Sequence, residues 1–252
     1  MNQCLLHIVL LFLAMLIAGC AMGYGQYGEN NNAVAYHYQM GLSFLGERNF
    51  TAALIEFTAA EKLDPENPEV LYNLGMAYIG KKRHDLAEQK LLQAIKLKPN
   101  YSTARNDLGV AYLELKRWDN AIQEFKIVKD DIFYENSENA AINLGLAYLG
   151  KGDYPKALEE LQTVASVNPR SPVVHLSLGR VWFAMDKSEQ AIAEYLKALE
   201  IYKDYAGAYY YLGQAYLKQN NLVAAKTAFK EVIRIIPDSD LGRSAIKYLE
   251  LF

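Results

Sequence analysis

The chain has very little cysteine. Of its 252 residues only Cys4 and Cys20 are cysteines, and both fall within the first 20 positions. No disulfide is therefore available to the rest of the chain, so its folded part must depend on a hydrophobic core. An apolar content of 52% is ample for such a core.

The chain also lacks the residue clusters that carry chemistry. A formal charge of −3, with scattered basic residues, excludes an obvious nucleic-acid footprint. His37, His84 and His175 fall in different repeats, with no carboxylate or cysteine at the spacing of metal ligands. There is no glycine-rich phosphate loop and no serine in a nucleophile elbow. We expect a protein that is not an enzyme and that binds no metal, cofactor, nucleic acid or small-molecule substrate.

The apolar run at the start of the chain is too short to cross a membrane. It extends from Ile8 to Ala18, whereas a transmembrane helix needs about 20 residues. Such a run is typical of the apolar region of a secretory signal peptide. No lysine or arginine precedes it, which departs from the usual signal.

The end of this run, Ala18-Gly19-Cys20, resembles the bacterial lipoprotein signal. The resemblance implies a signal peptide over residues 1–19, lipid on Cys20, and an anchor in the membrane. Ala21 is not the aspartate that retains such proteins in the inner membrane, so we expect the periplasmic face of the outer membrane. An ordinary cleaved signal or a short anchor is the alternative.

The segment that follows lacks aliphatic periodicity and is rich in glycine and asparagine. We interpret residues 20–33 as the lipidated cysteine and a flexible tether. Tyr24 and Tyr27 could instead lie at the lipid interface.

From residue 34 onward the chain repeats itself. A glycine after an apolar residue recurs at spacings of 34, 34, 36, 34 and 34 residues. An aromatic follows each glycine by three residues, an alanine by twelve and a bulky residue by sixteen. The glycines are Gly41, Gly75, Gly109, Gly145, Gly179 and Gly213; the bulky residues are Phe57, Leu91, Phe125, Leu161, Tyr195 and Phe229.

This pattern resembles the tetratricopeptide repeat, a helix-turn-helix unit of 34 residues. The small residues belong where two helices cross closely, and the bulky ones fill the space beside them. Pro65, Pro99, Pro169 and Pro237 are placed to end the second helix of four repeats. The resemblance implies an all-α fold, a right-handed α-solenoid of six tetratricopeptide helix-turn-helix repeats with a C-terminal capping helix.

We place the six repeats over residues 34–239 and the capping helix over residues 240–252, where Leu241, Ala245, Ile246, Leu249 and Phe252 recur at helical spacing. The one break in the period lies between the third and fourth repeats, in the acidic and aromatic segment Lys129–Asn136. The two extra residues there shift the stacking without making a domain boundary, because the apolar pattern resumes at Ala140.

In this family the groove faces positions two, five, six, nine and twelve of each repeat. An apolar groove with a row of amides beside it suits an amphipathic or extended peptide. The fifth, second and sixth positions lack the cationic set with which chaperone-cochaperone repeats grip a C-terminal carboxylate. The resemblance implies a partner-binding groove lined by Tyr38, Leu42, Tyr72, Asn73, Met76, Asn106, Val110, Ile142, Asn143 and Leu146.

The same residues have a plainer interpretation, since these positions also pack between neighbouring repeats. A second candidate patch is Tyr209-Tyr210-Tyr211, because aromatic side chains make good interface anchors.

The lipoprotein signal, the short tether, the six repeats and the longer third junction together resemble the pilotins of type IV pilus systems. Family members often have a proline beside the junction tyrosine, where this chain has Glu135. The resemblance implies that the secretin subunit is the partner and that its outer-membrane localisation and multimer assembly are the task. The alternative is a general periplasmic scaffold lipoprotein for cell-wall or envelope-assembly proteins.

Overall fold

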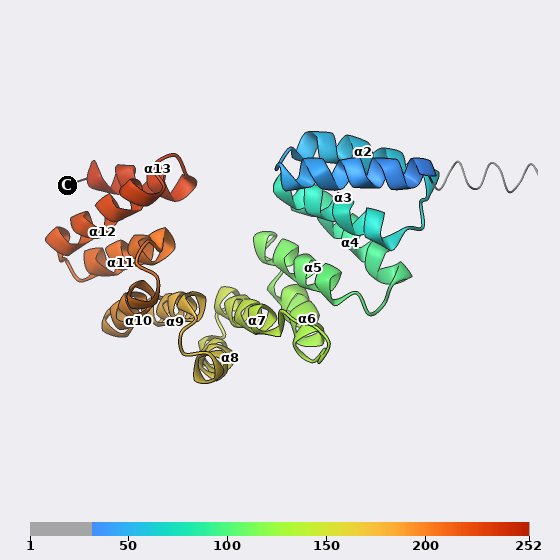
Figure 1. Ribbon diagram of the computed structural model, residues 1–252. Helices are drawn as coiled ribbons and strands as arrows, with labels where there is room; N and C mark the ends of the chain where they lie inside the picture. The colour runs from blue at the N-terminus through green and yellow to red at the C-terminus, as the bar shows by residue number, and fades with distance from the viewer. Residues whose placement is uncertain (1–31, 252) are drawn as a thin grey trace, which may run out of the picture. The chain divides into compact units, whose positions relative to one another are not determined.

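The computed structural model describes residues 32–251, which form helices joined by short turns and contain no strand. Figure 1 shows these helices in chain order. The first covers residues 32–46. The others are α2 (Phe50–Leu63), α3 (Pro68–Gly80), α4 (His84–Leu97), α5 (Ser102–Glu114), α6 (Trp118–Lys129), α7 (Ser137–Lys151), α8 (Tyr154–Val167), α9 (Pro172–Ala184), α10 (Ser188–Ile201), α11 (Ala206–Lys218), α12 (Leu222–Ile235) and α13 (Asp240–Leu249).

The expected fold class is confirmed as an all-α solenoid of helix-turn-helix hairpins. The predicted signal peptide and Cys20 lie outside the described residues, as does the tether except for residues 32 and 33, which are already helical. The chain forms two compact parts, an N-terminal part up to Ala104 and a C-terminal part from Arg105, and the boundary between them falls within the α5 sequence.

Each part is built by the same packing rule. The first helix of a hairpin contacts its own second helix and also the second helix of the preceding hairpin. In the C-terminal part α9, for example, packs against both α10 and α8. First helices also touch one another, as α7 touches α9 and α9 touches α11. A continuous core therefore runs between two layers of helices.

The repeat glycines lie where the bulky residue of the second helix crosses the first helix. A Cβ added at Gly75 would lie 2.7 Å from Leu91 Cγ, and one added at Gly145 would lie 2.6 Å from Leu161 Cγ. The other four repeat glycines face their own bulky partner in the same way. All six bulky side chains are fully buried, so each hairpin is closed by a ring or branched side chain pressed on bare backbone.

Every turn inside a hairpin contains one residue in the left-handed region. In the fourth hairpin it is Gly152, with φ of 85°. In the other five it is not a glycine: Arg48, Lys82, Lys116, Asp186 and Asn220 have φ between 57° and 67°. The turn geometry is therefore imposed by the packing of the two helices rather than by a glycine in the sequence.

The predicted role of the prolines is confirmed. The helices α2, α4, α8 and α12 each end two residues before a proline, and the intervening residue leaves the helical region. In the fifth hairpin, which lacks the proline, Tyr202 adopts the same extended conformation. In the third hairpin, Asp130 after α6 stays in the right-handed helical region instead. The longer junction, with its two extra residues, begins at this point.

Side-chain pairs link neighbouring helices in a pattern that alternates along the chain. In the first, third and fifth hairpins the pair lies inside the hairpin: His37 with Glu56 at 2.7 Å, Arg105 with Glu124 at 2.9 Å, His175 with Glu194 at 2.7 Å. In the second and fourth hairpins the lysine or glutamate at the equivalent place pairs instead with the second helix of the preceding hairpin. Those pairs are Lys90 with Glu61 and Lys129 with Glu160, both at 2.6 Å.

The helix α13, red in Figure 1, covers the open side of the last hairpin. Leu241, Ala245 and Leu249 pack there as expected. Ile246 does not, because it is 40% exposed. Tyr248, which the apolar spacing missed, packs instead, with its ring stacked 4.7 Å from that of Phe229. Phe252 lies outside the described residues.

Candidate functional site

In the N-terminal part, four of the predicted groove residues form one surface on two neighbouring first helices. Tyr38 and Leu42 lie on the helix over residues 32–46, and Tyr72 and Met76 lie on α3. All four side chains are half-buried. They contribute to the core and still present part of their apolar surface to solvent. We refer to these four residues as the N-terminal face.

Asn73 does not belong to the exposed part of this face, and its prediction as a partner contact needs correction. Its side chain is only 6% exposed. The amide Nδ2 donates to Tyr38 Oη at 3.2 Å and to the Glu69 carbonyl at 2.9 Å. Its donors are thus used inside the protein, because a buried amide must be satisfied. Asn73 positions Tyr38.

Beside Tyr38 the surface is hollowed. A cavity of about 360 Å³ is lined by Val34, Ala35, Tyr38, Asp64, Asn67 and Glu69. Burial and the charge of Glu69 raise the pKa of Tyr38, and the hydrogen bond from Asn73 opposes the shift. The Tyr38 hydroxyl therefore stays neutral, and the hollow has acidic walls. It suits an apolar segment that carries a basic side chain.

The other end of the N-terminal face is aromatic. The ring of Tyr72 lies 5.1 Å from that of Tyr101, and Lys98 Nζ lies 4.4 Å above the Tyr101 ring. Lys98 also pairs with Glu69 at 3.0 Å. Tyr101 was absent from the predicted site because it precedes α5 and has no counterpart in the repeat pattern.

The C-terminal part contains the other five predicted residues. Asn106, Val110, Asn143 and Leu146 are half-buried, and Asn143 Nδ2 donates to Asn106 Oδ1 at 3.5 Å. Ile142 is only 3% exposed. Its prediction as a partner contact is corrected: at this place in the fourth hairpin the fifth position lies inside the helix packing. Besides the two amides, only Val110 and Leu146 remain half-buried here, so this surface has two apolar side chains where the N-terminal face has four.

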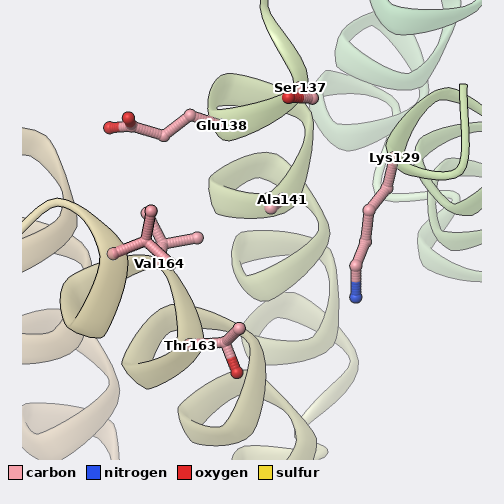
Figure 2. Close-up of a pocket in the computed structure, with 7 residues that line it drawn as sticks. Lys129, Ser137, Glu138, Ala141, Thr163 and Val164 are labelled. Carbon is pink, nitrogen blue, oxygen red and sulfur yellow. The ribbon is translucent and has the colours of Figure 1, made fainter. Parts of the chain in front are cut away.

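The third junction forms a surface that the repeat pattern did not reveal. In Figure 2 the residues that line a pocket project from α6, α7 and α8. The pocket has a volume of about 230 Å³ and is lined by Lys129, Ser137, Glu138, Ala141, Thr163, Val164 and Val167. Val167 is 82% exposed, and the junction residues Ile132 and Phe133 are each 88% exposed.

The second candidate patch, Tyr209-Tyr210-Tyr211, is mainly a packing feature. Tyr209 and Tyr210 pack on the cluster that joins α12 to α13. The ring of Tyr210 makes edge contacts with Tyr248, Phe229 and Tyr211. These contacts use the rings to hold the last helix, so the patch is not a free aromatic surface.

No group of three or more histidine, cysteine, aspartate or glutamate side chains suited to a metal ion occurs in residues 32–251. His37 Nδ1 lies 2.7 Å from a Glu56 carboxylate oxygen, and His175 Nδ1 lies 2.7 Å from one of Glu194. His175 Nε2 also donates to the Pro169 carbonyl at 3.0 Å. The described residues instead provide surfaces that can bind a partner: half-buried aromatic and aliphatic side chains, and one hollow with acidic walls beside Tyr38.

Within the same residues no helix is long and apolar enough to traverse a bilayer.

Comparison with protein-family models identifies the repeats directly. Models described as tetratricopeptide repeat match residues 38–102, 91–132, 139–171 and 206–239, and a model described as TPR repeat matches residues 179–220. Together they span most of the chain from residue 38 to residue 239.

Two solved structures of pilus proteins share the fold. PilF of Pseudomonas aeruginosa matches with a TM-score of 0.64 and 19% identity, over 87% of this chain and 99% of that one. PilW, described as a widely conserved type IV pilus biogenesis factor, matches with a TM-score of 0.72 and 19% identity, over 84% and 98%.

Among curated proteins, DnaJ homolog subfamily C member 3 of Rattus norvegicus is 27% identical over 132 residues, 50% of this chain. The matched region is 26% of that protein's length, so the likeness concerns a segment of repeats.

Proposed function

The chain belongs to the tetratricopeptide-repeat family, and from this premise we propose that it acts as a pilotin. It is a non-enzymatic lipoprotein, anchored through Cys20 at the periplasmic face of the outer membrane. It binds the type IV pilus secretin through the N-terminal face and promotes localisation and multimer assembly of that partner.

The observation that carries this proposal is the extent of the likeness to PilF and PilW. Both align over nearly their whole length with most of this chain, so the likeness is not confined to a single repeat. The lipoprotein signal that ends at Cys20 adds a second, independent support.

The mechanism is one of shielding. Acyl chains on Cys20 keep the hairpins close to the membrane. Tyr38, Leu42, Tyr72 and Met76 cover an apolar segment of a secretin subunit until subunits meet. Asp64 and Glu69 beside Tyr38 favour a segment with a lysine or arginine next to its apolar residues. The binding is of the kind in which an apolar row anchors an extended or helical peptide.

We predict that Tyr72→Asp and Met76→Asp each lower the level of secretin multimers by at least about tenfold, since a charge set against an apolar partner costs several kcal/mol. The measurement is an immunoblot of unheated outer membranes. The matched control is Ile55→Asp, which adds the same charge to an exposed apolar position of α2, away from the face. It should leave multimers unchanged.

Normal multimers in both face variants, with both proteins folded and membrane-bound, would contradict the role of the N-terminal face.

Cys20→Ser tests the anchor: the protein should leave the membrane fraction, and multimers should fall or appear in the wrong membrane. If deletion weakens the envelope and leaves pili intact, the general scaffold for envelope-assembly proteins is the better function.

A further inference from the structure

Arg180, on α9 in the C-terminal part, is a half-buried cation without a carboxylate partner. Its guanidinium Cζ lies 5.3 Å from the centroid of the Tyr211 ring, and within the described residues it has no ion pair and no hydrogen bond. The cation–π contact offsets part of the cost of removing the charge from water. The guanidinium N–H groups remain unused.

Two other half-buried cations have acidic partners. Lys90 pairs with Glu61 and Arg105 pairs with Glu124, each at hydrogen-bond distance. Such pairing is the rule, because a buried charge without a counterion is costly. Arg180 differs from Lys90 and Arg105 in this respect.

A second polar group beside Arg180 is also unsatisfied. Tyr195 is 0% exposed, and its hydroxyl has no hydrogen-bond partner among the described residues. Its ring presses on Gly179, the residue before Arg180, and stacks 6.1 Å from the ring of Tyr211. At this repeat position the other five hairpins have phenylalanine or leucine, so the hydroxyl is not needed to close the hairpin.

The surroundings define what such a site accepts. Burial raises the pKa of Tyr195 and of Tyr205, and the charge of Arg180 acts on both in the opposite direction. Both phenols are therefore neutral donors around one guanidinium. Leu176, one turn before Arg180, packs on the same cluster as Tyr205 and Tyr211. The contact with Tyr211 uses the guanidinium as a cation over a ring. It leaves the guanidinium N–H groups available to a carboxylate, which can accept two hydrogen bonds from them.

We propose that Arg180, with Tyr195, Tyr205 and Leu176, forms a binding site for a carboxylate of a partner peptide, either an acidic side chain or a chain terminus. The site lies on α9 to α11 and does not depend on the N-terminal face. Either proposal can therefore fail while the other stands.

The test is titration of the full chain, labelled with ¹⁵N-arginine, with three small probes while the Nε–H signals are followed by NMR. N-acetyl-leucine carries a terminal carboxylate, N-acetyl-glutamic acid α-amide carries one on its side chain, and N-acetyl-leucinamide has none. The Arg180 signal, assigned by its loss in Arg180→Met, should shift with the two carboxylates and not with the amide. The carboxylate probe that binds with the higher affinity identifies whether the partner's carboxylate is a chain terminus or an acidic side chain.

Tyr195→Phe tests the hydroxyl. Phenylalanine occupies the equivalent position in three hairpins, so the variant should fold, and its thermal midpoint should rise because an unsatisfied buried hydroxyl is removed. Affinity for the better carboxylate probe should fall about 2–10-fold, the worth of one hydrogen bond. A purely structural tyrosine would change the midpoint and leave the affinity unchanged, which overturns its part in the site.

In the titration, an Arg180 signal that shifts with neither carboxylate, or that shifts equally with the amide, overturns the proposal.

Discussion

At the scale of single residues, the fold depends on contacts between bare helix backbone and one large side chain. Gly75 illustrates this: the position of its missing Cβ is already filled by Leu91, whose branch atoms are fully buried and cannot retreat. Interiors packed to this density tolerate added atoms poorly. Gly46, near the end of the first described helix, has nothing within 4 Å of an added Cβ. The two glycines thus have opposite roles.

We predict that Gly75→Ala destabilises the protein by about 1–3 kcal/mol, the usual cost of overpacking. Gly46→Ala, the matched control, should be neutral or stabilising by up to about 1 kcal/mol, because alanine is the better helix former. Urea unfolding followed by circular dichroism measures both. If the two variants unfold at the same urea concentration, close helix contact is not the reason for the repeat glycine.

At the scale of elements, the turns and junctions are decided by what the helices on either side require. Lys82 joins α3 to α4 with φ of 58°, a conformation that costs a residue with a Cβ about 1–2 kcal/mol. The equivalent Gly152 adopts φ of 85° at little steric cost. Both turns give the same hairpin, since buried contacts along the helices outweigh the strain in one residue.

We predict that Lys82→Gly stabilises the protein by about 0.5–1 kcal/mol, the relief of strain exceeding the extra entropy that glycine loses on folding. Gly152→Ala should destabilise it by about 1 kcal/mol. Asn220→Gly is the internal control, and its gain should be smaller because asparagine tolerates the left-handed region. Denaturation midpoints measure all three; a loss of stability in Lys82→Gly would show that the turn conformation is not strained.

At the scale of the whole molecule, each hairpin contacts only its neighbours, so the ends need separate protection. The helix α13 supplies it at the C-terminus. The stacked rings of Tyr248 and Phe229, at an interplanar angle of 6°, hold that helix on the last hairpin. Loss of this contact should therefore lower the local stability of the last hairpin and α13 before it lowers the stability of the other hairpins.

We predict that Tyr248→Ala destabilises α12 and α13 by about 2 kcal/mol, less than a fully buried aromatic because Tyr248 is half-buried. Amide hydrogen exchange should quicken in these two helices and remain unchanged in α7 and α8. Ile246→Ala, on the exposed side of the same helix, should change exchange little. Faster exchange throughout the C-terminal part would instead mean that it unfolds as one unit.

Much of the fold could be predicted because the same packing positions recur in six repeats. The glycine, its bulky partner and the prolines that end the second helices recur in register, so their contacts follow from spacing alone. Tyr248 was not predicted as a packing residue because it lies outside the repeats, so no equivalent position could be compared with it. Ile246 was predicted to pack because of its helical spacing, but an apolar residue at that spacing can lie at the edge of the buried helix face.

The candidate site was predicted less completely, for a physical reason. A repeat position specifies which way a side chain points and leaves open how far its neighbours cover it. Tyr38, Leu42, Tyr72 and Met76 remain half-exposed, while the neighbouring Asn73 is turned inward to bond Tyr38. In the C-terminal part, the helix packing of the fourth hairpin encloses Ile142.

By itself, the order of residues determined the hairpins, since local spacing decides which side chains meet within a repeat. Only the tertiary structure decided which surfaces stay open and which charges stay unpaired. Exposure and pairing depend on every neighbour at once, as Arg180 shows. The sequence places this arginine directly after Gly179, and only the assembled helices set it beside Tyr211 with no counterion among residues 32–251.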